Sequence, residues 1–184
     1  MLSDAELLRE ALAGAEEAFT FLYRRRQGGV YRFALQMTGS VAAAEDVTQE
    51  TFLALLTHGR RYDAARGTVA SFLYGIARNY VMKWLDRNRG SELDDELPGG
   101  EDLLEDLTRR ETIEGVRRAV LSLPPVYREV VVLCDLQDAS YEEAAQALDC
   151  PIGTVRSRLC RGRGMLARKL RVAVTQAEAV RCVE

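Results

Sequence analysis

The segment from Ser140 to Arg171 constrains the fold most, because its residues specify where two short helices begin and end. Ser140 is a good N-cap, and Glu143 follows at the position that completes a capping box. Asp149 to Pro151 interrupt the helical pattern, and a second helix is predicted to open near Gly153 and Thr154. The segment therefore predicts two helices joined by a tight turn.

The second predicted helix has an apolar side and a cationic side. Its apolar residues recur at helical spacing, at Val155, Leu159, Leu166 and Leu170. A short helix, a turn and an Arg-rich second helix are typical of a helix-turn-helix, whose second helix enters the major groove of DNA. An amphipathic helix with a solvated basic face is the alternative. Seven cationic residues and no acidic residue lie between Pro151 and Arg171: Arg156, Arg158, Arg161, Arg163, Arg168, Lys169 and Arg171.

Charge is strongly segregated along the chain, although the net charge is only -3. Between Arg60 and Arg89 there are seven basic residues and two acidic ones, a balance of +5. Between Ser91 and Gly115 there are ten acidic residues and two arginines, a balance of -8. Two basic blocks separated by an acidic one indicate two contacts with a polyanion and a segment kept away from it.

Composition argues against several other classes of protein. The 4 cysteines include no CxxC pair, and His58 is the only histidine, so we expect no metal site and no cofactor. No glycine-rich phosphate loop and no nucleophile with a partner base is recognisable, so we do not expect an enzyme. Without a long apolar run or a signal sequence, we expect a cytoplasmic chain that makes no membrane contact of its own.

The N-terminal half has the apolar spacing of amphipathic helices, from Asp4 to Gln36 and again after Ser40, a potential N-cap. In the helix after Ser40, one side is predicted to face inward and the other outward. The inward residues are Ala44, Val47, Thr48, Thr51 and Leu55. Periodicity alone makes the opposite side an ordinary solvated face. We call this side the outward patch, and it consists of Asp46, Gln49, Glu50 and Leu53.

Aromatic residues gather among basic ones between Tyr62 and Trp84, where five of the 13 aromatic residues of the chain lie. Arg66 to Thr68 are predicted to form a loop, and Ser71 is predicted to start a helix. Aromatic rings beside cations suit single-stranded nucleic acid, because bases stack on the rings and phosphates pair with Lys and Arg. One side of this helix is predicted to pack and carries Leu73, Ala77, Tyr80 and Trp84. Another side is predicted to be free for binding and carries Asn79, Lys83 and Arg87. The aromatic residues expected to be reachable by nucleic acid are Tyr62, Phe72 and Tyr74.

The acidic stretch from 91 to 111 contains Pro98, Gly99 and Gly100 and is predicted to be a flexible linker. A helical pattern resumes at Ile113, is interrupted at Pro124 and Pro125, and continues to Leu136. The fold prediction is therefore all-α, with two small helical domains joined by a flexible acidic linker. The predicted divisions are a first domain at 1–90, the linker at 91–111, a second domain with the helix-turn-helix at 112–174, and a tail at 175–184.

These motifs together resemble the extracytoplasmic-function (ECF) class of bacterial RNA polymerase sigma factors, which keep only the second and fourth conserved sigma domains. The resemblance covers about residues 15 to 172. AEDVTQETFLALL resembles the helix that docks on the polymerase clamp, and GTVASFLYGIARNYVMKWLDRNR resembles the segment that melts and reads the minus-ten element. LPPVYREVVVLCDLQDASYEEAAQAL with GTVRSRLCRGR resembles the domain that reads the minus-thirty-five element.

The resemblance implies a sigma factor that binds core RNA polymerase and promoter DNA and that is held inactive by an anti-sigma factor. It assigns polymerase binding to the outward patch, Asp46, Gln49, Glu50 and Leu53. The minus-ten set comprises the three reachable aromatics and five polar residues, namely Tyr62, Arg66, Thr68, Phe72, Tyr74, Asn79, Lys83 and Arg87. The minus-thirty-five set comprises Thr154, Arg156, Ser157, Arg158, Cys160, Arg161 and Arg163, of which Arg158 and Arg163 suit phosphates.

Several residues depart from the family pattern. Asp149 stands where the turn of the helix-turn-helix usually has Gly, and Phe72 replaces a frequent tryptophan. Gly162 and Gly164 interrupt the recognition helix, at about 1 kcal/mol each relative to Ala. A helix-turn-helix regulator that binds duplex DNA on its own is the alternative function, but it leaves the aromatic and basic block after Tyr62 unexplained.

Overall fold

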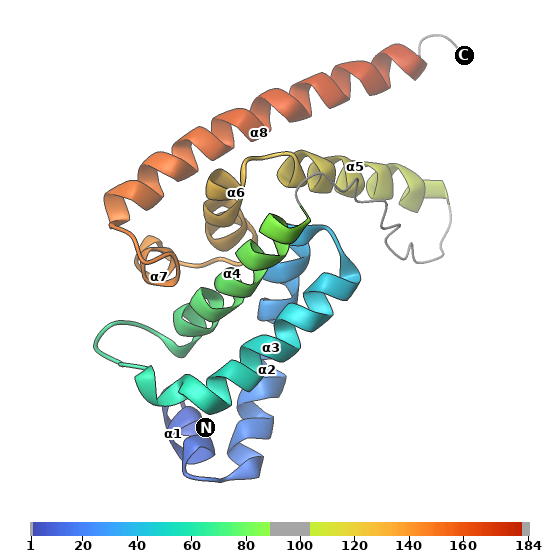
Figure 1. Cartoon of the computed structure of the whole chain (residues 1–184). Helices are drawn as coiled ribbons and strands as arrows, with labels where there is room; N and C mark the ends of the chain where they lie inside the picture. The colour runs from blue at the N-terminus through green and yellow to red at the C-terminus, as the bar shows by residue number, and fades with distance from the viewer. Residues whose placement is uncertain (1, 89–103, 182–184) are drawn as a thin grey trace.

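The structure is a computed structural model that describes residues 2–88 and 104–181, with side chains from 2 to 88 and from 113 to 171. Every regular element in these residues is helical, which confirms the all-α prediction. Figure 1 shows how the helices are arranged. In chain order they are α1 (Asp4–Leu12), α2 (Glu16–Thr38), α3 (Val41–His58), the short 3-10 helix η1 (Gly59–Arg61), α4 (Val69–Arg87), α5 (Leu104–Leu121), α6 (Pro125–Val131), the π-helical turn η2 (Val132–Leu136), α7 (Tyr141–Ala147) and α8 (Ile152–Arg181).

Helices α1 to α4 form the N-terminal domain, and α2 packs against each of the other three. Phe33, Leu55 and Leu73 are fully or almost fully buried in its core. Burial of large apolar side chains contributes about 1.5–3 kcal/mol each, so these helices are held by packing rather than by propensity. α2 ends at Thr38 and is capped by Gly39, whose φ of 76° lies in the left-handed region that glycine adopts readily.

Side-chain caps fix where two helices of this domain begin. The Ser40 hydroxyl accepts from the Ala43 amide, as predicted for the start of α3. The Thr68 hydroxyl accepts from the Ser71 amide, so α4 begins at Val69 and not at Ser71. The prediction of the α4 boundary was wrong because Thr68 and Ser71 are both good caps, and Ser71 instead lies buried in the first turn.

Helices α5 to α8 form the C-terminal domain, whose core includes Leu123, Leu133, Val155 and Leu159. α5 begins at Leu104, within the range predicted as linker, whereas we expected the helical pattern to resume only at Ile113. Acidic residues stabilise the first turn of a helix, so the acidic composition that indicated a linker is equally compatible with a helix start. Residues 89–103 lie outside the described residues.

The helix-turn-helix is formed by α7 and α8. Ser140 and Glu143 make the predicted capping box at the start of α7. Asp149, with φ of 49°, takes the left-handed conformation in the turn, as expected for a position where Gly is usual. The second helix begins at Ile152, one residue before the predicted opening. α8 continues to Arg181 through both Gly162 and Gly164, so the glycines do not interrupt it.

The two domains pack directly against each other, mainly through α4 and α7 (Figure 1). The domains also meet at α2, where the Gln137 amide donates to Gln36 Oε1 at 3.0 Å. The Arg128 guanidinium donates to the carbonyl oxygen of Met37 near the end of α2. This packing brings parts of the chain that are far apart in sequence to the same surface.

Candidate polymerase and nucleic-acid interfaces

The outward patch lies on the exposed side of α3. Asp46, Gln49, Glu50 and Leu53 are all exposed, whereas the five residues predicted to face inward are all buried. Leu53 keeps 51% of its surface exposed, so an apolar side chain lies on the same helix face as two carboxylates. The patch therefore combines charge, amide groups and exposed apolar surface on one helix face.

A groove of about 700 Å³ between α2 and α3 adjoins this patch, and Gln49 and Leu53 form part of its wall. The Tyr23 and Phe52 rings meet nearly edge to face with centroids 4.8 Å apart, and both line the groove. Sequence analysis did not identify this groove. The spacing of Phe19 and Tyr23, which puts both rings on one side of α2, was the available signal.

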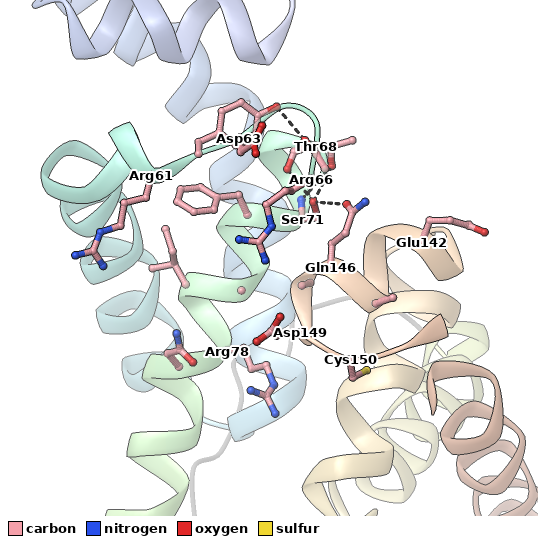
Figure 2. A pocket seen from close by; sticks show the side chains of 18 of the residues that line it. Arg61, Asp63, Arg66, Thr68, Ser71, Arg78, Glu142, Gln146, Asp149 and Cys150 are labelled. Atoms are coloured by element: carbon pink, nitrogen blue, oxygen red, sulfur yellow. Dashed lines mark hydrogen bonds between the residues drawn. The ribbon is translucent and has the colours of Figure 1, made fainter. Parts of the chain in front are cut away.

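A larger cleft of about 1020 Å³ contains five residues of the predicted minus-ten set (Figure 2). The Tyr62 ring packs on Phe72 with centroids 5.7 Å apart, and the Tyr62 hydroxyl donates to the Gly67 carbonyl at 3.0 Å. Burial raises the pKa of the Tyr62 hydroxyl, so this donor stays protonated. The loop before α4 is thereby held against the helix. The five residues are Tyr62, Arg66, Thr68, Phe72 and Asn79, and Arg61 and Arg78 join them.

The opposite wall of the cleft belongs to the C-terminal domain. It is formed by α7 and by the turn that leads into α8, including Gln146, Asp149 and Cys150 (Figure 2). Ser71 Oγ donates to Gln146 Oε1 at 3.0 Å, and Thr68 Oγ1 donates to Glu143 Oε1 at 3.2 Å. The cleft is thus an interdomain feature, which a reading of either motif alone does not predict.

Three members of the minus-ten set lie outside this cleft. Tyr74 faces α2, where its ring lies 5.6 Å from that of Phe33 and its hydroxyl approaches Gly29 closely. Burial raises the pKa of the Tyr74 hydroxyl. Lys83 is exposed and its ammonium lies 5.5 Å from the centre of the Tyr80 ring, and Arg87 is exposed at the end of α4. The structure therefore separates Tyr74 from Tyr62 and Phe72.

Five residues of the minus-thirty-five set are exposed on α8: Arg156, Ser157, Cys160, Arg161 and Arg163. Thr154 is half-buried in the first turn of α8. Arg158 turns toward the domain core and donates to Glu129 Oε1 at 3.3 Å. Arg163 donates to the Asp135 carboxylate at 3.1 and 2.5 Å, and this hydrogen bonding raises the pKa of its guanidinium. Two of the predicted phosphate contacts are therefore already ion-paired.

Sequence analysis missed two buried charges in α6. Glu129 is completely buried, and its carboxylate contacts Arg78 and Arg158. Arg128 is also buried and donates to backbone carbonyls. A charged pair inside the apolar run VYREVVVL was the only signal for either residue.

The described part of the chain, 2–88 and 104–181, holds no group of three or more His, Cys, Asp or Glu side chains that could bind a metal ion. Nor does any helix within it have the length and apolar character needed to cross a membrane.

Two family models match the chain, and they fall on the two helical domains. The model for Sigma-70 region 2 matches residues 22–90, which span most of the N-terminal domain. The model for Sigma-70 region 4 matches residues 113–166, which include the helix-turn-helix. Together these matches cover well over half of the chain.

Curated relatives agree with these matches. The chain is 35% identical over 173 residues to the ECF RNA polymerase sigma factor SigM of Mycobacterium tuberculosis, covering 91% of this chain and 85% of the relative. It is 34% identical over 152 residues to the ECF RNA polymerase sigma factor SigE of Mycolicibacterium smegmatis. That match covers 79% of this chain but only 58% of the length of the relative.

Two solved structures share the fold. CnrH, determined in complex with the cytosolic domain of CnrY, aligns with a TM-score of 0.73 at 24% identity, covering 92% of this chain and 97% of CnrH. The sigma factor RpoE of Bartonella quintana, determined with the anti-sigma factor NepR, aligns with a TM-score of 0.67 at 23% identity, covering 84% of this chain and 97% of RpoE. Sequence motifs, family models and relatives agree, and the chain belongs to the ECF class of sigma-70-type RNA polymerase sigma factors, which are DNA-binding transcription initiation factors and not enzymes.

Proposed function

We propose that this chain binds core RNA polymerase and directs promoter-specific initiation, with the N-terminal domain reading and melting the minus-ten element and the C-terminal domain reading the minus-thirty-five element. The observation that carries the proposal is that Arg66, Phe72 and Asn79 line one cleft while a helix-turn-helix in the same chain exposes an arginine-rich face. A duplex-binding regulator needs only the second of these features. The predicted divisions, 1–90 and 112–174, assign one promoter element to each domain.

The minus-ten role is supported by the chemistry of the cleft. Arg61 and Arg66 can pair with phosphates, and the Phe72 ring in the same cleft offers a surface on which a base can stack. Asn79 can donate to and accept from the edge of a base. Lys83 and Arg87, which are exposed further along α4, would extend the phosphate contacts beyond the cleft. Tyr74 would act by holding α4 against α2.

The minus-thirty-five role is supported by the exposed side of α8. Arg156 and Arg161 can each form two hydrogen bonds with a guanine edge, at about 1–3 kcal/mol of discrimination per good pair. Ser157 and Cys160 lie on the same side and are small enough to allow close approach of the groove. Arg158 and Arg163 are ion-paired within the domain, so they would contribute less to DNA binding than Arg156 and Arg161.

Polymerase binding is assigned to the outward patch. Its exposed leucine between acidic and amide side chains suits a partner surface that combines basic and apolar residues.

We further propose that an anti-sigma factor binds this chain, as NepR binds the Bartonella protein. The proposed function would be exercised in the cytoplasm, where the polymerase works.

The polymerase assignment can be tested with Leu53→Asp and Asp46→Lys in a co-elution experiment with sigma-free core polymerase. Both residues are exposed, so we expect the variants to fold normally and to lose co-elution. Ile113→Asp is the matched control, because Ile113 is similarly exposed, at 58%, but lies on α5. Normal co-elution of both patch variants would contradict the assignment of the patch.

A further inference from the structure

Tyr141, the first residue of α7, interacts with two arginines of α8. The guanidinium carbon of Arg156 lies over the Tyr141 ring, 5.7 Å from its centre, which is within the range of a cation–π contact. The Tyr141 ring is half-buried and packs against the hydrophobic core, whereas Arg156 is exposed. A ring that the core holds in place therefore supports an exposed guanidinium.

The second arginine, Arg163, interacts with the hydroxyl end of Tyr141. Arg163 is itself fixed by the Asp135 carboxylate of η2, to which it donates at 3.1 and 2.5 Å. Hydrogen bonding to Asp135 is the main cause that raises the pKa of the Arg163 guanidinium, and hydrogen bonding to Tyr141 adds a smaller contribution. The position of the Tyr141 ring is thus set by the core and by the Asp135–Arg163 pair.

The two arginines lie on the same side of α8, because they are seven positions, or about two helical turns, apart. They differ in what remains free to bind DNA. Arg163 uses its N–H groups on Asp135, whereas a ring face engages the Arg156 guanidinium mainly through its charge. The N–H donors of Arg156 therefore remain available to a base edge while the side chain is held.

We propose that Tyr141 is a positioning residue of the helix-turn-helix, which holds the Arg156 guanidinium ready to bind one base pair of the minus-thirty-five element. The inference rests on the proposed function, because that function assigns base reading to Arg156. An arginine side chain loses rotamer freedom when it binds, and a supported side chain has already lost part of it. Tyr141 therefore sharpens the preference for one base pair through Arg156, without a contact of its own with that base pair.

A promoter library with a randomised minus-thirty-five element tests the proposal. Full-length variants are incubated with sigma-free core polymerase, and sequencing of a transcribed barcode in each template gives the base preference at each position. Arg156→Ala identifies the base pair that Arg156 reads. We expect Tyr141→Leu to weaken the preference at that same base pair by about 2- to 5-fold, the value of an exposed cation–π contact, and to leave the other positions unchanged.

Two further variants separate the ring from the hydroxyl and from general packing. Tyr141→Phe keeps the ring, so it should keep most of the preference at the Arg156 base pair. Tyr127→Leu is the matched control, because Tyr127 is also half-buried in the C-terminal domain but lies in α6, and it should leave every preference unchanged. Addition of Tyr141→Leu to Arg156→Ala should cause no further loss, because the residue that Tyr141 supports is already absent.

Side-chain NMR relaxation gives a second readout that needs neither polymerase nor DNA. The order parameter of the Arg156 Nε–H group is expected to fall in Tyr141→Leu but not in Tyr141→Phe. The same group of Arg163 is the internal control and should remain ordered in both variants, because Asp135 holds it.

The inference is overturned if Tyr141→Leu leaves either the preference at the Arg156 base pair or the Arg156 order parameter unchanged. An equal fall in transcription from all library members would indicate a role in folding alone, and an equal loss in Tyr141→Phe would indicate a phosphate contact of the hydroxyl; both outcomes contradict the inference. Unaltered preferences in Arg156→Ala would remove the assignment of Arg156 and the inference with it. A wild-type chain that directs no transcription contradicts the proposed function, whereas transcription with preferences that Tyr141→Leu does not alter contradicts the inference alone.

Discussion

Arg128 illustrates how a charged residue can be buried at the end of two helices. Its guanidinium donates to the carbonyls of Leu121 and Leu123 at the end of α5 and to that of Met37 near the end of α2. The last carbonyls of a helix lack partners within the helix and attract cations. Burial lowers the pKa of Arg128 to about 10, so the side chain remains charged at neutral pH.

Replacement of Arg128 should therefore be costly. We expect Arg128→Ala to lower the free energy of unfolding by about 3 kcal/mol, because three buried or partly buried carbonyl groups lose their charged donor. Urea denaturation followed by circular dichroism measures the loss. Arg118→Ala is the control, because Arg118 is exposed on α5, and it should change stability by less than about 0.5 kcal/mol. Similar losses in the two variants would show that the capping contacts contribute little.

The sequence predicts some features of single residues, but it does not predict the burial of Arg128. The left-handed conformation of Asp149 could be anticipated because the turn of a helix-turn-helix needs it at that position. Arg128 gives no such signal, because one of its acceptors, the Met37 carbonyl, is 91 positions away in the chain. The side on which Tyr74 lies also depends on tertiary packing, here against Phe33.

At the scale of elements, α8 contains two glycines with different surroundings. A Cβ atom at Gly162 would lie 2.8 Å from Val131 Cγ2 and 3.3 Å from the Tyr127 carbonyl oxygen. At Gly164 the nearest atom would be the end of the Arg168 side chain, 3.9 Å away. Gly162 therefore permits close packing of α8 on α6, whereas Gly164 has no such role.

This difference predicts opposite effects of the same substitution. Gly164→Ala should raise the free energy of unfolding by about 1 kcal/mol, because alanine favours the helix and meets no obstacle. Gly162→Ala should lower it by about 1 kcal/mol or more, because the added methyl group overpacks the contact with α6. Thermal denaturation of both variants measures the two changes. Equal stabilisation by both substitutions would contradict the packing of α8 on α6.

Helix boundaries were predictable where one capping signal stood alone. The start of α7 follows from the Ser140 and Glu143 pair, since the other nearby cap residue, Asp138, is followed three positions later by Tyr141 and so cannot form a capping box. The start of α4 was predicted at Ser71, but Thr68, three positions earlier, caps the helix by accepting from the Ser71 amide. The start of α5 at Leu104 was hidden because acidic residues suit both a linker and a first helical turn.

At the scale of the whole molecule, the sequence predicts what each domain is but not how the two meet (Figure 1). Periodicity correctly separates the buried and exposed sides of α3, because that depends on one helix alone. The second wall of the cleft depends on contacts such as Ser71 with Gln146, which are 75 positions apart. No local pattern encodes such a contact, so half of the candidate site could not be predicted.

In the function proposed for this chain, both domains act together in promoter-specific initiation by core polymerase. The most direct test incubates the chain with sigma-free core polymerase and a promoter library and sequences the 5′ ends of the transcripts. We predict discrete start sites downstream of paired minus-thirty-five and minus-ten elements, which disappear when the chain is omitted. The absence of chain-dependent transcripts, together with tight binding of duplex DNA by the chain alone, would contradict the claim and favour a conventional helix-turn-helix regulator.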